Sequence, residues 1–145
     1  MSTHPSVVPQ DEILETQPGQ KRTALVIDDD PDFLLQVRLG LESLGFDVTT
    51  TESEKGATEE IAHWRPDLVV VDLIMDHPDS GFLLSYRLKK KYPRTPVIMV
   101  SAVTSRTGLN FDASTPSERG WVRADAFLAK PVRIEQLQRE IERLM

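Results

Sequence analysis

Hydrophobic residues along the chain fall into two kinds of segment: short continuous runs and longer stretches with helical spacing. Continuous apolar or β-branched runs are typical of strands, and strands buried on both faces are apolar at every position. Such runs occupy residues 24–27, 46–51, 68–71, 96–100 and 126–129. Apolar residues that recur every three or four positions predict helices, over about residues 30–44, 55–64, 81–92 and 134–144. Strands and helices therefore alternate, which predicts an α/β fold with a parallel sheet and helices on both faces.

Capping and turn residues support the predicted helix ends. Asp30 is suited to cap the first helix, and Pro31 fits its first position because proline lacks the amide proton that would be unpaired there. Gly45 follows the last apolar position of the same helix, as C-terminal glycines commonly do. The second helix should end before Pro66, because the residue preceding a proline disfavours helical backbone.

The length of 145 residues suits a single domain. Residues 1–21 are polar and contain three prolines, so we predict a disordered tail there and a folded domain over residues 22–145. Residues 103–123, between the fourth and fifth predicted strands, have no clear helical period and are predicted to be irregular.

Composition excludes several classes of function. A formal net charge of −6 argues against sequence-independent nucleic-acid binding, which needs a basic face. The absence of cysteine excludes disulfides and thiolate metal sites. No apolar run approaches the ~20 residues that span a membrane, and no secretory signal is visible, so we expect a cytoplasmic protein.

Reactive polar residues follow four of the five predicted strands. Asp28 and Asp29 follow the first strand, and Asp72, Ser101 and Lys130 follow the third, fourth and fifth. Because the carboxyl ends of parallel strands share one edge of the sheet, these side chains should lie together. Three carboxylates in one cleft repel one another, and Mg²⁺ would remove that repulsion.

A helix cap, a turn or an exposed position would explain any one of these residues by itself. Their joint placement at strand ends favours a chemical site instead. A carboxylate beside Mg²⁺ can attack a phosphoryl donor and form an acyl phosphate. The ammonium of Lys130 and the hydroxyl of Ser101 can then neutralise the added negative charge.

Four segments resemble the response-regulator receiver family, and the resemblance covers about residues 22–145. They are LVIDDDPDF (25–33), PDLVVVDLIM (66–75), PVIMVSA (96–102) and AFLAKP (126–131). The resemblance implies a flavodoxin-like fold, in which a doubly wound, five-stranded parallel sheet has the strand order 2-1-3-4-5.

The resemblance also assigns roles at the metal site. It implies that Asp72 is the phosphoacceptor and that Asp29 binds Mg²⁺ directly, whereas Asp28 holds the metal through water. The backbone carbonyl of Ile74 resembles the third protein ligand. Asp72 itself completes this set of metal-binding residues.

Three further roles follow from the same resemblance. Ser101 resembles the switch hydroxyl that moves to bond the phosphoryl group, Phe127 the aromatic rotamer switch, and Lys130 the lysine that grips the phosphoryl group. The phosphodonor would be a sensor histidine kinase or a histidine phosphotransfer protein. The chain would then be a signalling switch that acts through protein contacts, without being a turnover enzyme. No output domain is expected after the last helix.

The chain departs from the family pattern in two loops. Asp76 replaces a proline, and Gly81 lies one residue farther from Asp72 than is usual, which adds His77 and Asp79 near the site. The segment between Ser101 and Lys130 is also longer than usual. Its apolar residues are candidates for packing the loop or for a partner contact: Phe111, Trp121 and Val122.

The residues two positions beyond Asp72 and Ser101 are Ile74 and Val103. Neither side chain can orient an attacking water through a hydrogen bond. We therefore expect slower self-dephosphorylation than in receivers with polar residues at these positions.

Two alternatives of other classes remain open from the sequence. One is a pseudo-receiver, a docking module that is never phosphorylated. The other is a phosphatase of the haloacid-dehalogenase type, with Asp28 as nucleophile and Asp30 as its partner. A nucleotide- or flavin-binding protein is disfavoured because no glycine-rich phosphate loop follows the first strand.

Overall fold

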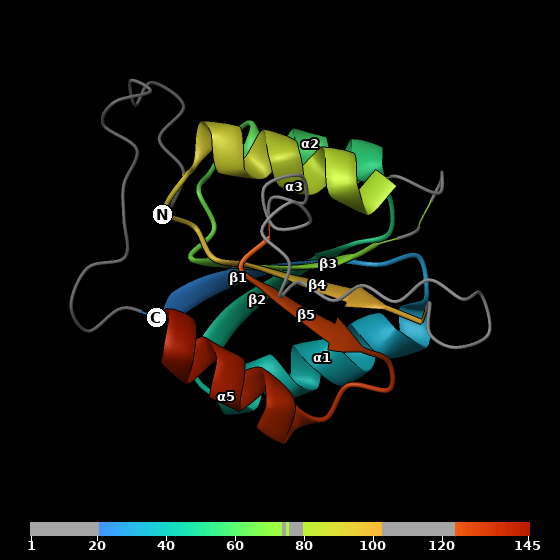
Figure 1. Cartoon of the computed structure of the whole chain (residues 1–145), viewed down its shortest axis with the longest axis vertical. Helices are drawn as coiled ribbons and strands as arrows, with labels where there is room; N and C mark the ends of the chain where they lie inside the picture. Colours follow the sequence, from blue (N-terminus) through green and yellow to red (C-terminus); the bar gives the residue numbers. More distant parts are fainter. Residues whose placement is uncertain (1–20, 74, 76–79, 103–123) are drawn as a thin grey trace, which may run out of the picture.

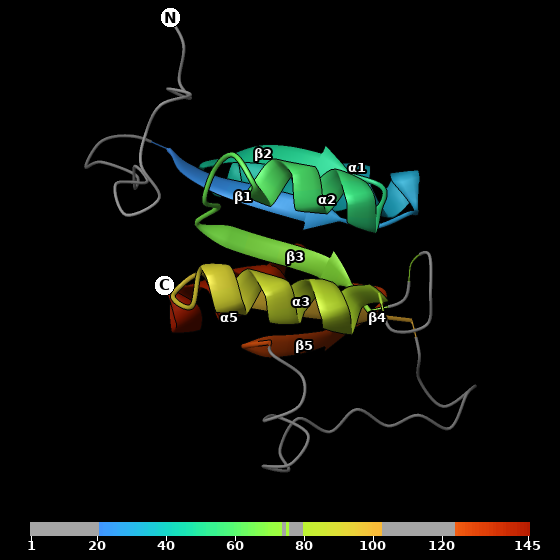
Figure 2. The same cartoon turned by 90° about the horizontal axis from the view of Figure 1, so that it is seen from above.

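A computed structural model describes residues 21–73, 75, 80–102 and 124–145. Within this part of the chain, five parallel strands form one sheet in the order β2-β1-β3-β4-β5 (Figure 1). The strands are β1 (Arg22–Ile27), β2 (Phe46–Thr51), β3 (Leu68–Asp72), β4 (Val97–Ser101) and β5 (Ala126–Ala129). The predicted flavodoxin-like strand order is confirmed, and Figure 2 shows β2, β1 and β3 side by side from above.

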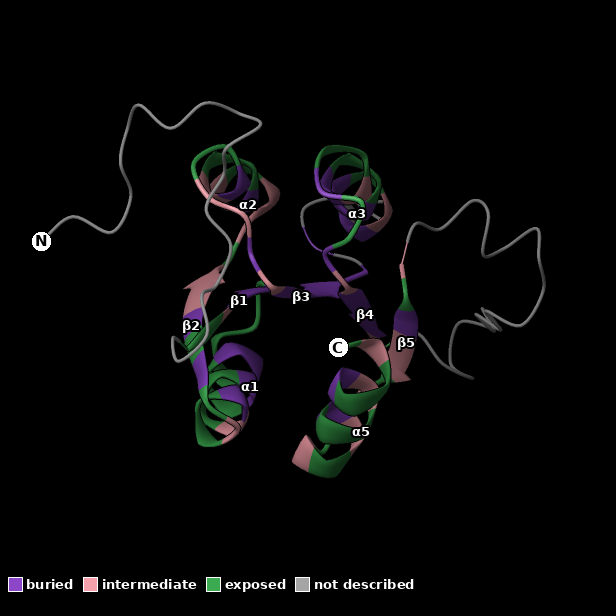
Figure 3. Ribbon diagram, turned by 90° about the vertical axis from the view of Figure 1, so that its left-hand side faces the viewer, coloured by how far each residue is buried: buried purple, intermediate pink, exposed green. Residues whose placement is uncertain are grey.

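Helices cover both faces of the sheet, as the alternating pattern predicts. They are α1 (Pro31–Ser43), α2 (Glu54–Ile61), α3 (Ser80–Lys91) and α5 (Ile134–Leu144). Helices α1 and α5 lie on one face, and α2 and α3 lie on the other (Figure 3). The doubly wound arrangement is therefore present in the described residues.

The core of the described residues divides into two hydrophobic clusters, one on each face of the sheet. In β1, Ala24 and Val26 face the cluster under α1 and α5, whereas Leu25 and Ile27 face the cluster under α2 and α3. This alternation follows from the two-residue period of a strand. Because both faces are covered, all residues of β3 are buried, which explains why its sequence is a continuous apolar run up to Asp72.

The predicted ends of α1 are confirmed by its capping contacts. The side chain of Asp30 accepts a hydrogen bond of 3.0 Å from the backbone amide of Asp32, and Pro31 is the first helical residue. Gly45 follows the helix with a φ angle of 96°, a conformation that disfavours residues with a Cβ atom. Asp30 and Pro31 thus determine where α1 begins after β1, and Gly45 marks where the chain leaves the helix.

The start of α3 packs closely against the end of β3. A Cβ atom on Gly81 would collide with the backbone carbonyl oxygen of Asp72, and it would lie 2.6 Å from that of Leu73. The amide of Gly81 donates a hydrogen bond of 2.9 Å to the Leu73 carbonyl. Glycine at position 81 therefore allows α3 to approach the backbone that carries Asp72.

The large apolar residues of α3 are only partly buried. Leu83 and Tyr86 are 44% and 46% exposed, whereas Leu84 and Leu88 are buried, as is Tyr92 just beyond the helix. The helix contains more large apolar residues than its contact with the sheet can cover. The spacing of apolar residues along the sequence therefore does not determine which of them are buried.

Asp125 anchors the start of β5. Its Oδ2 atom accepts a hydrogen bond of 2.8 Å from the amide of Val97 and one of 2.9 Å from the ammonium of Lys89. The strand that leads to Lys130 is thereby tied both to β4 and to α3.

Several predictions lie outside the described residues. They concern the tail over residues 1–20, the position of Ile74, the added loop residues 76–79, and the irregular segment 103–123 with Phe111, Trp121 and Val122. Among the described helices, none combines the length and the apolar character needed to cross a membrane.

Candidate functional site

The carboxyl ends of four strands bring the predicted site residues to one edge of the sheet. Asp28 follows β1, Asp72 and Ser101 end β3 and β4, and Lys130 follows β5. The amide of Lys130 donates a hydrogen bond of 2.9 Å to the carbonyl of Ser101, and the amide of Leu73 donates one of 2.8 Å to that of Val100. Backbone pairing therefore continues to the residues that carry the reactive side chains.

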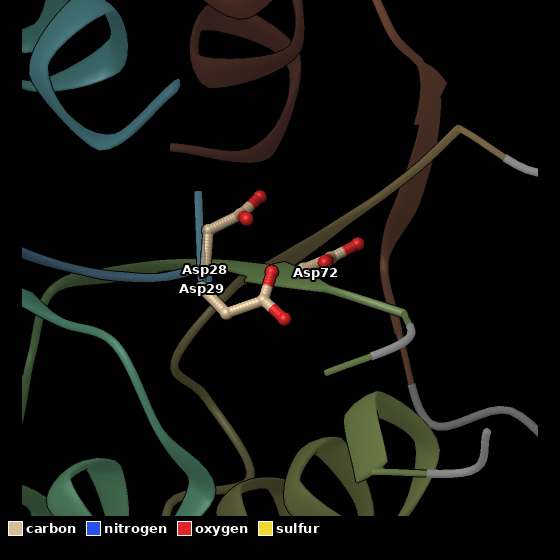
Figure 4. Close-up of side chains that lie close together, drawn as sticks. All are labelled: Asp28, Asp29 and Asp72. Atoms are coloured by element: carbon tan, nitrogen blue, oxygen red, sulfur yellow. The ribbon is translucent and has the colours of Figure 1, made fainter. Parts of the chain in front are cut away.

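Three carboxylates form a compact cluster at this edge. Asp28, Asp29 and Asp72 each offer one oxygen, and these oxygens all lie within 4.8 Å of one another (Figure 4). Asp28 is 0% exposed and Asp72 is 6% exposed, whereas Asp29 is exposed to solvent. The cluster therefore has a buried side formed by the protein and an open side at Asp29.

Asp28 is held by the backbone and by an ion pair. Its Oδ1 atom accepts a hydrogen bond of 2.9 Å from the amide of Asp30. Its Oδ2 atom lies 2.8 Å from Nζ of Lys130, which lowers the cost of burying the carboxylate. Because each carboxylate oxygen has two lone pairs, this oxygen can accept a further interaction beside the ion pair.

Burial dominates the electrostatics of Asp28. It raises the pKa of the Asp28 carboxyl above its ordinary value, because loss of water disfavours the charged form more than the nearby Lys130 ammonium favours it. The charge of the neighbouring Asp29 raises this pKa further. A cation bound among these groups would offset both effects.

The ammonium of Lys130 lies between two carboxylates and an aromatic ring. Its Nζ atom is 2.8 Å from Oδ2 of Asp28 and 4.0 Å from Oδ2 of Asp72. It also lies over the ring of Phe33, 4.4 Å from the ring centroid. Lys130 is therefore close enough to respond to a change of charge on either acid.

Ser101 and Phe127 occupy neighbouring strands beside this cluster. Ser101, the last residue of β4, is partly exposed, and its backbone pairs with Ala129 in β5. Phe127 pairs with Met99 and is partly buried against the cluster under α2 and α3. Both residues thus lie in the strands that lead to the site.

The structure adds two features that the sequence analysis did not assign to the site. Phe33 falls within the helix predicted over residues 30–44 and is buried, and its ring also faces the ammonium of Lys130. Gly81 was noted for its distance in sequence from Asp72. Its close contact with the Asp72 backbone explains why a residue without a Cβ atom is needed at this position. Ile74, predicted to supply a metal-binding carbonyl, lies outside the described residues.

The sequence matches a known protein family over most of its length. Residues 24–142 match the model of the response regulator receiver domain. Among curated relatives, the heme response regulator HssR of Staphylococcus aureus is 34% identical over 114 residues, which are 78% of this chain and 46% of that protein. The chain thus spans about half the length of the curated relatives it matches.

Solved structures agree with the observed fold. The chemotaxis response regulator CheY4 of Vibrio cholerae superposes with a TM-score of 0.72 and 22% identity, over 87% of this chain and 100% of that chain. The BeF3-activated DrrB receiver domain gives a TM-score of 0.68 and 24% identity, over 86% of this chain and 97% of that one. At these identities the structures support the fold, and the family match supports membership: the chain belongs to the response-regulator receiver family of two-component systems.

Proposed function

We propose that this receiver domain, over residues 22–145, is a signalling switch that accepts a phosphoryl group on Asp72 with the help of Mg²⁺. Receiver domains are generally signalling domains rather than enzymes. The observation that supports the proposal is the meeting of three carboxylates and Lys130 at the carboxyl edge of the sheet. A parallel α/β sheet places its ligand sites at this edge.

Asp72 is better placed than Asp28 to act as the nucleophile. Asp28 is fully buried, one of its oxygens accepts the Asp30 amide, and the other lies against Lys130. The ammonium is 4.0 Å from Asp72, a distance that leaves it near the acceptor without the close pairing seen at Asp28. This arrangement, together with the family match, disfavours the phosphatase alternative, in which Asp28 would attack.

The acidic cluster fits a hard divalent cation. Mg²⁺ prefers a few carboxylate oxygens together with water and phosphate oxygens. Asp28, Asp29 and Asp72 would hold it, and the carbonyl of Ile74 would add a ligand by family resemblance. The second lone pair of Asp28 Oδ2 and the exposed Asp29 provide acceptor capacity for the ion and its waters. When bound, the metal would supply positive charge that offsets the negative charge of the carboxylates and of the incoming phosphoryl group.

The transfer is an in-line displacement at phosphorus. An oxygen of the Asp72 carboxylate forms the new bond, while the bond from phosphorus to the imidazole nitrogen of the donor histidine breaks. The electron pair of that bond remains on the nitrogen. The product carries added negative charge at Asp72, which Lys130 and Ser101 neutralise by charge and hydrogen bonding.

The partners and the output follow from this chemistry. Response regulators are phosphorylated by sensor histidine kinases, and we propose such a kinase or a histidine phosphotransfer protein as the donor. Movement of Ser101 and Phe127 would then change the surface near β4 and β5 and alter protein contacts. We propose the cytoplasm as the location.

Mass spectrometry of the intact protein tests the proposal. The wild-type chain and Asp72→Asn are incubated with acetyl phosphate, with and without Mg²⁺. A Mg²⁺-dependent phosphoryl adduct should form on the wild type and be absent from Asp72→Asn. The control is Asp47→Asn, because Asp47 is an exposed acid on β2 and should not affect the adduct.

Two results would contradict the proposal. A folded wild-type protein that never gains the adduct would indicate a docking module. An adduct that survives in Asp72→Asn and is lost in Asp28→Asn would place the nucleophile at Asp28.

A further inference from the structure

The first turn of α1 contacts the ammonium group of Lys130. Nζ of Lys130 lies 4.4 Å from the centroid of the Phe33 ring. A cation within about 6 Å of an aromatic centroid is attracted by the negative face of the ring, more strongly where water is excluded. The Lys130 side chain is only 19% exposed, so water screens this contact weakly.

The position of the Phe33 ring is fixed by the core. Phe33 is 6% exposed and belongs to the hydrophobic cluster under α1 and α5, which also contains Val37 and Val132. Close packing of that kind restricts the ring to few orientations. The ring is therefore a stable surface for the ammonium, even though the lysine side chain is itself long and flexible.

Helix α1 also binds the backbone just beyond Lys130. The Nε2 atom of Gln36, three residues after Phe33, donates a hydrogen bond of 3.2 Å to the carbonyl of Val132. One turn of α1 thus contacts both the ammonium of Lys130 and the chain two residues later. These two contacts restrict where the lysine can reach from its strand.

The contact with the ring is compatible with an ammonium position near either Asp28 or Asp72. The ammonium is 2.8 Å from Oδ2 of Asp28 and 4.0 Å from Oδ2 of Asp72. Attraction to a ring face is not confined to one position, because it persists wherever the cation lies over the face within about 6 Å of the centroid. The ammonium can therefore shift from Asp28 toward Asp72 while it remains over the ring.

We infer that Phe33 is a positioning residue for the phosphorylation of Asp72. It holds the ammonium of Lys130 over a fixed surface between Asp28 and Asp72, ready to neutralise charge added at Asp72. This inference rests on the proposed function. Phe33 itself touches neither the acceptor nor the phosphodonor in this role, because it acts through Lys130.

The first test compares rates of Mg²⁺-dependent phosphorylation by acetyl phosphate. Phe33→Leu keeps an apolar side chain but removes the ring face, and it should slow adduct formation by about two- to thirty-fold, the range expected for a cation–ring contact. Phe33→Tyr keeps the ring and should restore a rate close to that of the wild type. Ile61→Val, a buried change in α2 on the opposite face of the sheet, should lower stability without slowing the reaction.

The second test is a double-mutant cycle with Lys130→Met, which keeps most of the length of the side chain and removes its charge. Phe33→Leu should slow phosphorylation in the wild-type background and cause little further slowing in Lys130→Met. Equilibrium unfolding of the same four proteins should show that the ring and the ammonium are coupled. This second readout does not depend on phosphorylation.

The outcomes separate the inference from the proposed function. Three results would overturn the positioning role alone. Phe33→Leu could react at the wild-type rate, or it could slow phosphorylation equally with and without Lys130→Met. Phe33→Tyr could also slow phosphorylation as much as Phe33→Leu does. A folded wild-type protein that takes no phosphoryl group would overturn the proposed function, and this role of Phe33 with it. In that case, coupling between Phe33→Leu and Lys130→Met in the unfolding measurements would show that the ammonium–ring contact stabilises the fold without a role in phosphorylation.

Discussion

Charge is unbalanced at the edge of the sheet. In the described part of the chain, the carboxylates of Asp28, Asp29 and Asp72 meet a single nearby ammonium, that of Lys130. Burial of Asp28 makes the imbalance more costly, because a desolvated carboxylate is not screened by water. The site should therefore gain stability from a bound cation.

Mg²⁺ should raise the thermal stability of the wild-type protein. At a free concentration of about ten times Kd, the gain in unfolding free energy should be about 1.4 kcal/mol. Asp28→Asn should weaken this gain strongly, and Asp47→Asn should leave it unchanged. Thermal unfolding over a range of MgCl₂ concentrations, at constant ionic strength, measures the effect. An equal Mg²⁺-dependent shift in Asp28→Asn would contradict a metal site at this cluster.

Tyr92 gives a pH-dependent contribution to stability that is separate from the site. The residue is 5% exposed, and its hydroxyl donates a hydrogen bond of 2.8 Å to the carbonyl of Ile61. Burial raises the pKa of Tyr92 above its ordinary value of 10.0. As pH rises above 10, the unfolded chain loses this proton first, so it binds fewer protons than the folded chain and stability falls.

Tyr92→Phe should remove that alkaline loss. At neutral pH it should lower the unfolding free energy by about 1 kcal/mol, because the hydrogen bond to Ile61 is lost. Urea unfolding at neutral pH and above pH 10 compares the variant with the wild type. Tyr86→Phe, at a position 46% exposed on α3, serves as the control. An alkaline slope that is unchanged in Tyr92→Phe would refute this assignment.

At the scale of elements, α1 and α3 support the site from opposite faces of the sheet. Helix α1 brings Phe33 to Lys130, and α3 begins at the backbone of Asp72 through Gly81. The approach of α3 depends on the missing Cβ atom of Gly81, so a methyl group at this position should displace the backbone of Asp72, the proposed phosphoacceptor.

Gly81→Ala should lower the unfolding free energy by about 1–3 kcal/mol, because the added methyl group meets backbone atoms that cannot move cheaply. It should also slow phosphorylation by displacing the peptide that carries Asp72. Gly40→Ala is the matched control, because its Cβ atom would meet only the end of the Ile134 side chain, at 2.6 Å from Cδ1. Equal phosphorylation rates in Gly81→Ala and the wild type would refute the coupling between α3 and the acceptor.

Asp125 should be required for the order of β5. Asp125→Ala removes the acceptor used by the Val97 amide and the Lys89 ammonium, at an expected cost of about 1–3 kcal/mol. Amide hydrogen exchange should increase in β5, while β1 and β3 change little. Asp47→Ala, on the opposite edge strand, provides the comparison. Unchanged exchange in β5 would show that β4 alone holds this strand.

At the scale of the whole molecule, the sequence predicted what depends on local patterns and on the order of elements. Continuous apolar runs located the strands, and parallel topology then required Asp28, Asp72 and Lys130 to share an edge. The ammonium of Lys130 lies closer to Asp28 than to Asp72. This difference depends on side-chain conformation, which the spacing of residues along the sequence does not determine. The ring of Phe33 could not be assigned to the site, because its helical spacing is equally that of a core residue.

The most direct measurement locates the phosphoryl group on the wild-type chain. After reaction with acetyl phosphate and Mg²⁺, borohydride reduction converts an aspartyl phosphate to homoserine, and fragment mass spectrometry identifies the position. Homoserine at position 72, formed only with Mg²⁺, is the expected result. Homoserine at position 28 or 29 and none at 72 would contradict the assignment of Asp72 as the phosphoacceptor.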